Sequence, residues 1–369
     1  MDVGRRVCVI GGGVAGCALT WRLAAAGVQV TLVERNLVGS GSTSKNAGGV
    51  RTQFGDAASV AYAMATRRLL ADWDARTEDP IDFRRIGYLF VAKSDNTAAA
   101  LQQVVERQVG LGGDATWLGR RELNTLVPEC NVEDVVGASW TPGDGCIDPS
   151  ALTQGLRARA VALGASVIEG ASVVGCNRER HQWGVRGTSG FSSQSDTVVI
   201  AAGAWTGRVA ALFGANLPVM PRVSQVFRLS TFGTVRPDMP MVIGFDEGRA
   251  WIHPSGPEFL AGLDVTREGS NRTDEFEDVA PDWEAVVPLG EWLAHRMPGL
   301  GDLALSGGWA GLLELTPDER PIVGWTDVEG VYAFTGFSGH GLSIAPGMSQ
   351  DAANEICHRA SEAPLLAAF

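Results

Sequence analysis

The sequence predicts an α/β fold with two parts: a doubly wound parallel sheet assembled from separated segments, and a mainly antiparallel β part with helices. Residues 7–34 alternate strand, glycine-rich turn, helix and strand. Short β-prone runs between glycine and proline turns dominate residues 216–309. A glycine-rich pattern returns over residues 309–343. A chain of 369 residues is long enough to bury a core in each part.

The first strand and turn carry a nucleotide-binding pattern. Residues 7–10 are a short apolar run typical of a buried parallel strand, and Gly11, Gly13 and Gly16 follow at G-x-G-x-x-G spacing. In this Rossmann-like pattern the three glycines allow a tight turn, a close approach of the backbone to a pyrophosphate, and close packing of the helix on the strand. The unpaired amide N–H groups at the helix start then stabilise the phosphate.

Glu34 ends the second strand, which we place at residues 28–33. Its carboxylate is suited to accept hydrogen bonds from the ribose hydroxyls of an adenine dinucleotide and would repel a 2′-phosphate, so FAD or NAD is favoured over NADP. A glycine-rich turn that only packs a helix on a sheet is the alternative. That alternative would not explain the acidic residue at the end of the second strand or the unpaired amides at the helix N-terminus.

Composition limits the possible partners and location. A net charge of −12 argues against nucleic acid and anionic membrane surfaces as partners. The six cysteines show no C-x-x-C spacing and no nearby histidine pair, so no metal site is expected. No apolar stretch approaches the roughly 20 residues needed to cross a bilayer, and no basic leader precedes a cleavage site. We therefore expect a cytoplasmic protein without a membrane span.

A loop rich in glycine and hydroxyl groups spans residues 37–51. Small residues let a backbone lie against a flat ring or a phosphate and provide hydrogen-bond donors. A solvated linker is the alternative, but residues 46–50 are apolar for a flexible tether. Arg51 ends the loop, where its guanidinium can hold a substrate carboxylate in a bidentate pair.

The remaining elements follow from hydrophobic periodicity and turn residues. Helices are expected at residues 57–79, 97–111, 150–163 and about 345–360. Strands are expected at residues 86–92, 165–168, 171–174, 183–185, 223–229, 241–243, 250–253, 259–265 and 331–334. Residues 197–205 are expected to form a buried strand that runs into a small-residue turn and a helix. The amide-rich segment at residues 335–343 gives a second potential anion site, suited to negative charge on a reduced flavin ring.

Four segments, in order along the chain, resemble the D-amino-acid-oxidase-type FAD-dependent oxidoreductases. They are the dinucleotide unit with Glu34, the loop from Gly39 to Arg51, residues 199–205, and residues 316–318 with 336–341. Within that family the chain is most similar to the group of sarcosine oxidase, glycine oxidase and the L-proline dehydrogenase β-subunit. The resemblance implies FAD and oxidation of the C–N bond of a small amino acid or secondary amine. Hydride passes from the α carbon to flavin N5, an imine forms, and O2 or another electron acceptor reoxidises the flavin.

The resemblance also implies the division into domains and the binding residues. The FAD-binding domain is expected to be discontinuous, at residues 1–80, 145–215 and 310–369, with a substrate domain at residues 81–144 and 216–309. The residues expected to contact FAD are Gly11, Gly13, Val14, Ala15, Gly16, Glu34, Arg35, Ser42, Thr43, Ser44, Val173, Ala202, Gly203, Trp205, Gly311, Gly336, Gly339, His340, Gly341, Leu342 and Ser343.

Four side chains are expected to contribute to catalysis: Arg51, His253, His340 and Tyr88. Arg51 docks the substrate carboxylate, and the other three are expected to orient the amine. A structural role is the alternative for His253, a lone histidine in a strand, and a packing role for His340 within the flavin segment. No residue needs to act as a strong base, because the amine lone pair itself drives hydride transfer.

Departures from the family pattern also matter. Residues 309–315 lack the flavin-linking cysteine of monomeric sarcosine oxidases, so noncovalent FAD is expected. Ser343 stands where those enzymes carry a carboxylate-binding lysine, whereas their arginine is retained as Arg51. Residues 258–264 contain no counterpart of their oxygen-activating lysine.

Two other functions remain open at this point. A FAD-dependent 2-hydroxy-acid dehydrogenase would use the same flavin and arginine, but it needs a base for the hydroxyl proton. A non-catalytic flavin subunit of a larger complex is the other possibility. The sequence leaves the substrate, the electron acceptor and the oligomeric state open.

Overall fold

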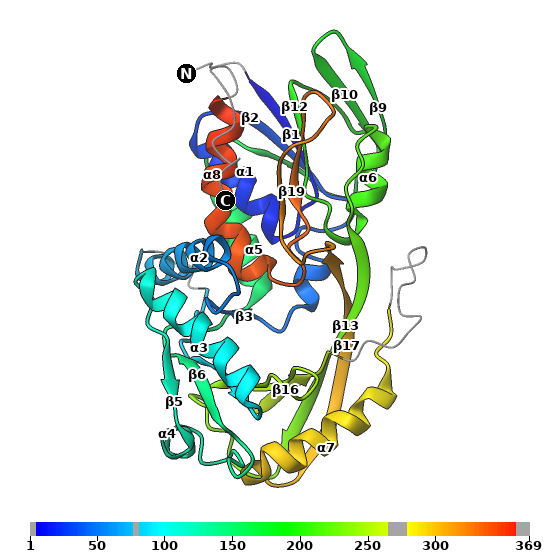
Figure 1. The fold of residues 1–369 in the computed structure, drawn as a ribbon. Coiled ribbons are helices and arrows are strands. Elements are labelled where there is room, and N and C mark those ends of the chain that lie inside the picture. The colour runs from blue at the N-terminus through cyan, green and yellow to red at the C-terminus, as the bar shows by residue number, and fades with distance from the viewer. Residues whose placement is uncertain (1–4, 77–80, 265–278, 359–369) are drawn as a thin grey trace.

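The computed structural model describes residues 5–76, 81–264 and 279–358 (Figure 1). A six-stranded sheet forms the first part of the fold, in the order β18-β19-β12-β1-β2-β8. Its strands are β1 (Arg6–Ile10), β2 (Gln29–Val33), β8 (Ser166–Ile168), β12 (Thr197–Ile200), β18 (Ile322–Trp325) and β19 (Val331–Thr335). All neighbours pair in parallel except β18 and β19. The predicted parallel sheet from separated segments is confirmed.

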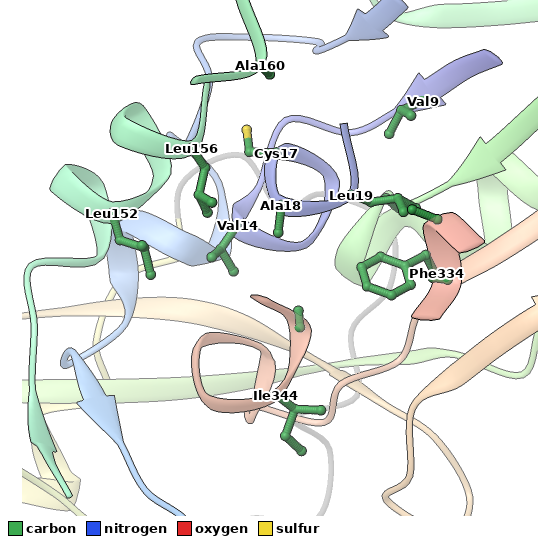
Figure 2. Packing of buried hydrophobic residues seen from close by; sticks show 14 of the residues in the cluster. Val9, Val14, Cys17, Ala18, Leu19, Leu152, Leu156, Ala160, Phe334 and Ile344 are labelled. Carbon is green, nitrogen blue, oxygen red and sulfur yellow. The ribbon is translucent and has the colours of Figure 1, made fainter. Parts of the chain in front are cut away.

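Helices α1 (Val14–Ala25), α5 (Pro149–Ala162) and α8 (Gly341–His358) pack together beside this sheet, and α2 (Ala57–Arg76) packs on α8. Figure 2 shows the α1 side chains Val14 and Leu19 among apolar groups of α5, α8 and β19. Close packing of α1 on β1 requires Gly16, because a Cβ there would collide with the Gly11 carbonyl. The apolar spacing of α1 therefore acts as predicted.

An eight-stranded sheet forms the second part, in the order β17-β13-β16-β15-β14-β4-β6-β5. Its strands are β4 (Tyr88–Ala92), β5 (Thr116–Leu118), β6 (Gly137–Thr141), β13 (Met220–Thr231), β14 (Met241–Gly244), β15 (Ala250–Ser255), β16 (Glu258–Gly262) and β17 (Leu303–Leu315). Only β14 and β4 pair in parallel, so the expectation of a mainly antiparallel sheet is confirmed.

Helices accompany the second sheet. They are α3 (Asp95–Gly110), α4 (Arg120–Leu126) and α7 (Val286–Arg296). Leu289 and Leu293 of α7 join the core of the sheet with Phe227 and Phe259. These residues are almost fully buried, and their burial holds the strands that reach the site in a fixed register.

The remaining elements are smaller. A three-stranded sheet contains β9 (Val173–Glu179), β10 (Gln182–Gly187) and β11 (Ser192–Ser195), and β3 (Gly49–Val50) pairs with β7 (Gly145–Cys146). The short helices are α6 (Thr206–Leu212), η1 (Ser42–Lys45), η2 (Gly203–Trp205), η3 (Trp283–Ala285) and η4 (Pro298–Leu300).

Strands β13 and β17 run from one part of the molecule to the other, as Figure 1 shows, and pair from Met220↔Leu315 to Thr231↔Leu303. The domain boundary expected between residues 309 and 310 thus falls inside one continuous strand. The last helix also begins earlier than expected, at Gly341 instead of about residue 345. Over the described residues, no helix is both long and apolar enough to traverse a bilayer.

Candidate functional site

A cavity of about 630 Å³ is lined by both large sheets. The lining comprises the carboxyl ends of β1, β2 and β12, the loop at residues 39–51, parts of β4, β13, β14, β15 and β17, and residues 338–343. Ligands of open parallel sheets bind outside the carboxyl ends of the strands, where the strand order reverses. The cavity occupies that position, because β1 lies between β2 and β12.

One end of the cavity is formed by the glycine-rich turn. Gly11 has a φ of +112°, and a Cβ there would lie 3.1 Å from Ala202 Cα. Gly13 differs, because its φ is −75° and the nearest atom to an added Cβ is Thr43 Oγ1 at 3.3 Å. Gly11 is therefore required by the fold itself, whereas Gly13 leaves its space to the cavity.

Glu34 is held at the end of β2 by backbone amides. Its Oε2 accepts a hydrogen bond from Gly12 N at 2.7 Å, and its Oε1 accepts one from Asn36 N at 2.9 Å. Nearby, the Arg35 guanidinium lies 4.4 Å from the centre of the Trp205 ring. Both charged side chains line the cavity at the edge expected to meet a ribose.

These residues fit FAD. The glycine turn leaves a cradle in front of Gly13, which has no side chain to fill it, and the N-terminus of α1 opens into the same space, where Val14 and Ala15 line the cavity. A helix N-terminus and a glycine cradle favour a pyrophosphate without any basic side chain. FAD is thus compatible with the donor groups that the chain presents.

The start of α8 lies at the other end of the cavity. Gly339 has a φ of +83°, which turns the chain so that the helix begins with Gly341, Leu342 and Ser343 against the cavity. Ser343 Oγ accepts a hydrogen bond from the backbone N of Arg51 at 3.1 Å. The serine that replaces a family lysine thereby joins α8 to the loop that carries Arg51.

Arg51 is fixed by aromatic rings and by two hydrogen bonds. Its Cζ lies 4.0 Å from the centre of the Phe54 ring and 5.5 Å from that of Phe90. Nη1 donates to the Gln53 carbonyl, and Nη2 lies 3.0 Å from His340 Nε2. Burial lowers the pKa of Arg51, but a guanidinium stays protonated at neutral pH. The result is a fixed cation in the cavity wall.

The tautomer of His340 follows from this contact. A guanidinium only donates, so His340 Nε2 must accept the hydrogen bond. Burial lowers the pKa of His340 well below its usual value, and the nearby positive charges of Arg51 and Arg249 lower it further. The ring also packs edge-on against Phe54 with 5.1 Å between centres. His340 is therefore neutral, and its free lone pair is already engaged.

A buried polar network supports the segment that follows Arg51. Asp144 accepts from Thr52 N at 2.8 Å and from Thr52 Oγ1 at 2.7 Å, and it pairs with Arg67 Nη1 at 3.2 Å. Gln108 donates to Thr52 Oγ1, and Gln53 binds the Tyr88 carbonyl and Ser139. Burial raises the pKa of Asp144 to about 6. These contacts fix the backbone that presents Arg51.

Tyr88 lines the cavity from β4 and is almost fully buried. Its hydroxyl lies over Gly49, where any side chain would collide with it. Burial raises the pKa of Tyr88 well above its usual value. The phenol is therefore protonated at physiological pH and can act only as a neutral hydrogen-bonding group.

His253 lies behind the cavity and is not among the residues that line it. Its Nδ1 donates to the Pro254 carbonyl at 3.0 Å, and its ring stacks on Trp251 with 5.7 Å between centres. Burial lowers the pKa of His253 to about 4, so the ring is neutral. The structure thus places His253 among the packing groups of β15, outside the set of residues that line the cavity.

The other expected cofactor contacts line the cavity, except Gly16, Ser44 and Gly336. Gly16 packs α1 on β1, as described above. Ser44 Oγ donates to the Ser40 carbonyl at 3.0 Å and closes a turn. Gly336 has a φ of +73° and donates its N–H to Glu314 Oε2 at 3.1 Å. All three shape the backbone that surrounds the cavity.

Several lining residues were not predicted. They include Lys45, Phe90, Met241, Arg249, Trp251 and Glu314. Glu314 accepts from Thr335 Oγ1 at 3.0 Å, and burial raises its pKa. Phe90 could have been inferred in part from Tyr88, because residues two apart on a strand such as β4 point to the same face. No sequence pattern points to Arg249, because its position depends on how β14 pairs with β15.

One group of side chains in the described part of the chain has the spacing of metal ligands: Asp134, Glu247 and His295, whose ligand atoms lie within 4.8 Å. The buried Arg296 already pairs with both carboxylates, at 2.8 Å from Asp134 and 3.0 Å from Glu247. Lys93 lies 2.9 Å from Asp134. The protein itself supplies the positive charge between these carboxylates.

Comparisons with known proteins agree with this geometry. The model of the FAD dependent oxidoreductase family matches residues 6–355. Mitochondrial sarcosine dehydrogenase of Mus musculus is 26% identical over 377 residues, which cover 95% of this chain and 39% of that protein. The chain thus spans about two fifths of that relative's length.

Two further relatives match over most of both chains. Glycine oxidase of Geobacillus kaustophilus (strain HTA426) is 27% identical, covering 92% of this chain and 89% of that protein. The crystal structure of L-proline dehydrogenase from P. horikoshii superposes with a TM-score of 0.88 at 28% identity, covering 98% of this chain and 96% of the other.

Proposed function

Because this chain belongs to the FAD-dependent oxidoreductase family of D-amino-acid-oxidase type, we propose that it oxidises the C–N bond of a small amino acid or secondary amine. The observation that carries the proposal is the fixed guanidinium of Arg51 in the cavity wall. Across the described residues, no carboxylate lies within ion-pair distance of it. A buried cation without an anion is suited to a ligand that brings one.

Arg51 binds the substrate carboxylate and sets the position of the α carbon. Its contacts with Gln53 and His340 leave other N–H groups of the guanidinium for a carboxylate. Phe54 and Phe90 exclude water from the pair and so strengthen it. Bound FAD supplies the two-electron acceptor for the hydride that leaves the α carbon.

Neutral groups surround the amine. Protonated Tyr88 and neutral His340 add no charge, so they do not favour the protonated amine over the free amine that reacts. The N-terminus of α8 offers its amides and positive dipole end to negative charge that develops in the cavity. Chemistry of this kind needs positioning more than a strong base.

We propose that FAD is held without a covalent bond. In the described part of the chain no cysteine lines the cavity, and Cys8, Cys17, Cys130 and Cys146 are buried elsewhere. Acid precipitation of the FAD-loaded protein should leave the flavin in the supernatant. Flavin that stays with the pellet would contradict noncovalent binding.

A 2-hydroxy-acid dehydrogenase is the less favoured function. It requires a base for the hydroxyl proton, but the lone pair of His340 Nε2 is engaged by Arg51, and His253 does not line the cavity. Anaerobic mixing of the isolated, FAD-loaded chain with matched amines and 2-hydroxy acids separates the two. We expect amines alone to bleach the flavin absorbance. Bleaching by hydroxy acids alone would replace the proposal, and none with either would favour a non-catalytic flavin subunit.

The electron acceptor and the location remain predictions. Oxygen consumption measured beside reduction of an artificial acceptor would distinguish an oxidase from a dehydrogenase. A cytoplasmic location rests on the sequence alone, and the similar sarcosine dehydrogenase is a mitochondrial protein.

A further inference from the structure

We propose that the substrate is an amine with two carboxylates, the first bound by Arg51 and the second by Arg249. This inference rests on the amine oxidation proposed above. It adds a second anion site, which restricts the substrate to amino dicarboxylates or to amino acids with a carboxyalkyl group on nitrogen.

Arg249 reaches the cavity from the turn between β14 and β15. It directly precedes Ala250, the first residue of β15, and lines the cavity beside Ile243 and Trp251. The turn is closed by a hydrogen bond from Ala250 N to the Glu247 carbonyl at 3.1 Å. A short turn between two paired strands fixes where the long side chain of Arg249 starts.

An aromatic surface connects the two guanidiniums. Arg51 Cζ lies 5.5 Å from the centre of the Phe90 ring, and Arg249 Cζ lies 5.5 Å from that of Phe245. The rings of Phe90 and Phe245 are in edge contact, with 6.0 Å between centres. The two arginines therefore stand over rings that contact each other, one in β4 and one directly after β14. Phe90, Arg51 and Arg249 all line the cavity, so a small ligand that packs on Phe90 has both guanidiniums in the same wall.

In the part of the chain that the structure describes, both arginines line the cavity without a carboxylate partner. Among residues 5–76, 81–264 and 279–358, neither Arg51 nor Arg249 forms an ion pair. Arg222 differs, because it pairs with Asp264 and also feels the charge of Glu319. The pairing of Arg222 leaves Arg51 and Arg249 to receive anions from a ligand.

The two positive charges affect each other. Arg249 contributes to the lowered pKa values of both Arg51 and His340, which places its charge within electrostatic reach of them. A ligand with one carboxylate neutralises only one of the two cations. A ligand with two carboxylates neutralises both and removes their repulsion, so it should bind more tightly. The pyrophosphate does not compete, because its cradle lies at the Gly11 end.

Two thioethers test the second anion site without turnover. (Methylthio)acetate carries one carboxylate and thiodiacetate carries two, with sulfur in place of the amine nitrogen. Calorimetric titration of the FAD-loaded protein should give a Kd for thiodiacetate at least about tenfold lower, as expected for an added charge-assisted contact. Arg249→Gln should remove this preference, and Arg249→Lys should keep most of it.

Arg228→Gln is the matched control. Arg228 lies on β13 of the same sheet, outside the cavity lining, near Glu258. Its replacement changes the net charge equally and should leave both Kd values unchanged. Equal Kd values for the two thioethers in the wild type, or equal weakening of both by Arg249→Gln, would overturn the second site.

Flavin reduction by amines with one or two carboxylates tests the dicarboxylate inference separately from the proposed amine oxidation. If amines with one carboxylate bleach the flavin as efficiently as those with two, the function stands and the dicarboxylate inference falls. If no amine bleaches it, the proposed function falls, and the thioether titrations still report whether Arg249 binds an anion. We expect kcat/KM to favour dicarboxylate amines by about tenfold or more, and Arg249→Gln to remove that advantage.

Discussion

The two ends of the cavity are built by different means. At the nucleotide end the backbone forms the site, through the turn at Gly11 and Gly13 and the first amides of α1. At the substrate end side chains form it, with Arg51, Tyr88 and Arg249 arriving from separate loops and strands. A backbone site tolerates variation in side chains but no added Cβ atoms. A side-chain site depends on the packing behind each residue.

Replacing a glycine at the nucleotide end should have the largest effect, a loss of folding stability. A Cβ at Gly16 would enter the Gly11 carbonyl, so Gly16→Ala should destabilise the fold by about 3 kcal/mol. A Cβ at Gly13 would lie 3.3 Å from Thr43 Oγ1, so a small shift of that side chain accommodates it, and Gly13→Ala should cost the apoprotein much less stability than Gly16→Ala while weakening FAD binding. Urea unfolding and flavin titration separate the two. Normal FAD affinity in Gly13→Ala would show that no ligand approaches Gly13 closely.

Arg51→Gln tests the substrate end. It should reduce kcat/KM for amines with a carboxylate by about a hundredfold or more, because a buried charge-assisted pair is lost. The content of FAD should stay unchanged, since Arg51 lies away from the glycine turn. Steady-state kinetics and flavin absorbance measure both, with Arg228→Gln as a charge-matched control. Unchanged kinetics would remove the proposed anchor.

Asp144→Asn tests the support behind Arg51. In the folded protein burial raises the pKa of Asp144 from 3.8 to about 6, so its contribution to stability is present below about pH 4 and is lost as the pH rises through 6. The free energy of unfolding of the wild type relative to the variant should therefore fall by about 2 to 3 kcal/mol between pH 4 and 7. Urea unfolding across that range measures it. A constant difference would mean that Asp144 titrates normally.

His253→Leu should have the smallest effect on catalysis. Loss of the buried hydrogen bond from His253 to the Pro254 carbonyl should cost about 1 to 2 kcal/mol of stability. Since His253 does not line the cavity, kcat should change by no more than about threefold. Thermal unfolding and steady-state rates test this. A loss of several hundredfold in kcat with stability intact would restore His253 as a group that orients the amine.

The same contrast explains what the sequence could predict. The nucleotide end lies within residues 7–34, where strand, turn and helix follow one another in the chain. Its glycine spacing predicts the backbone geometry directly, because each glycine allows a turn or a close approach. The family resemblance is confirmed by the match over residues 6–355. Arg51 could be selected because the loop before it is compact and glycine-rich.

Other elements had weak local signals. Strand β17 was not predicted, because Gly307, Gly308 and Gly311 interrupt its apolar pattern. Helix α7 carries Pro288 in its first turn and Gly290 soon after it, so its sequence resembles a turn, and its formation depends on packing against the second sheet. Arg249 was missed for a related reason. Its position in the same cavity wall as Arg51 follows from the pairing of β14 with β4 and β15, which sequence alone does not specify.

The most direct test of the account is an anaerobic titration of the FAD-loaded chain with small carboxylate-bearing amines, in the wild type and in Arg51→Gln. We expect the wild type to lose its visible flavin absorbance and the variant to need a concentration about a hundredfold higher. A chain that takes up no FAD, or whose bound flavin is bleached by none of these amines, would contradict the account.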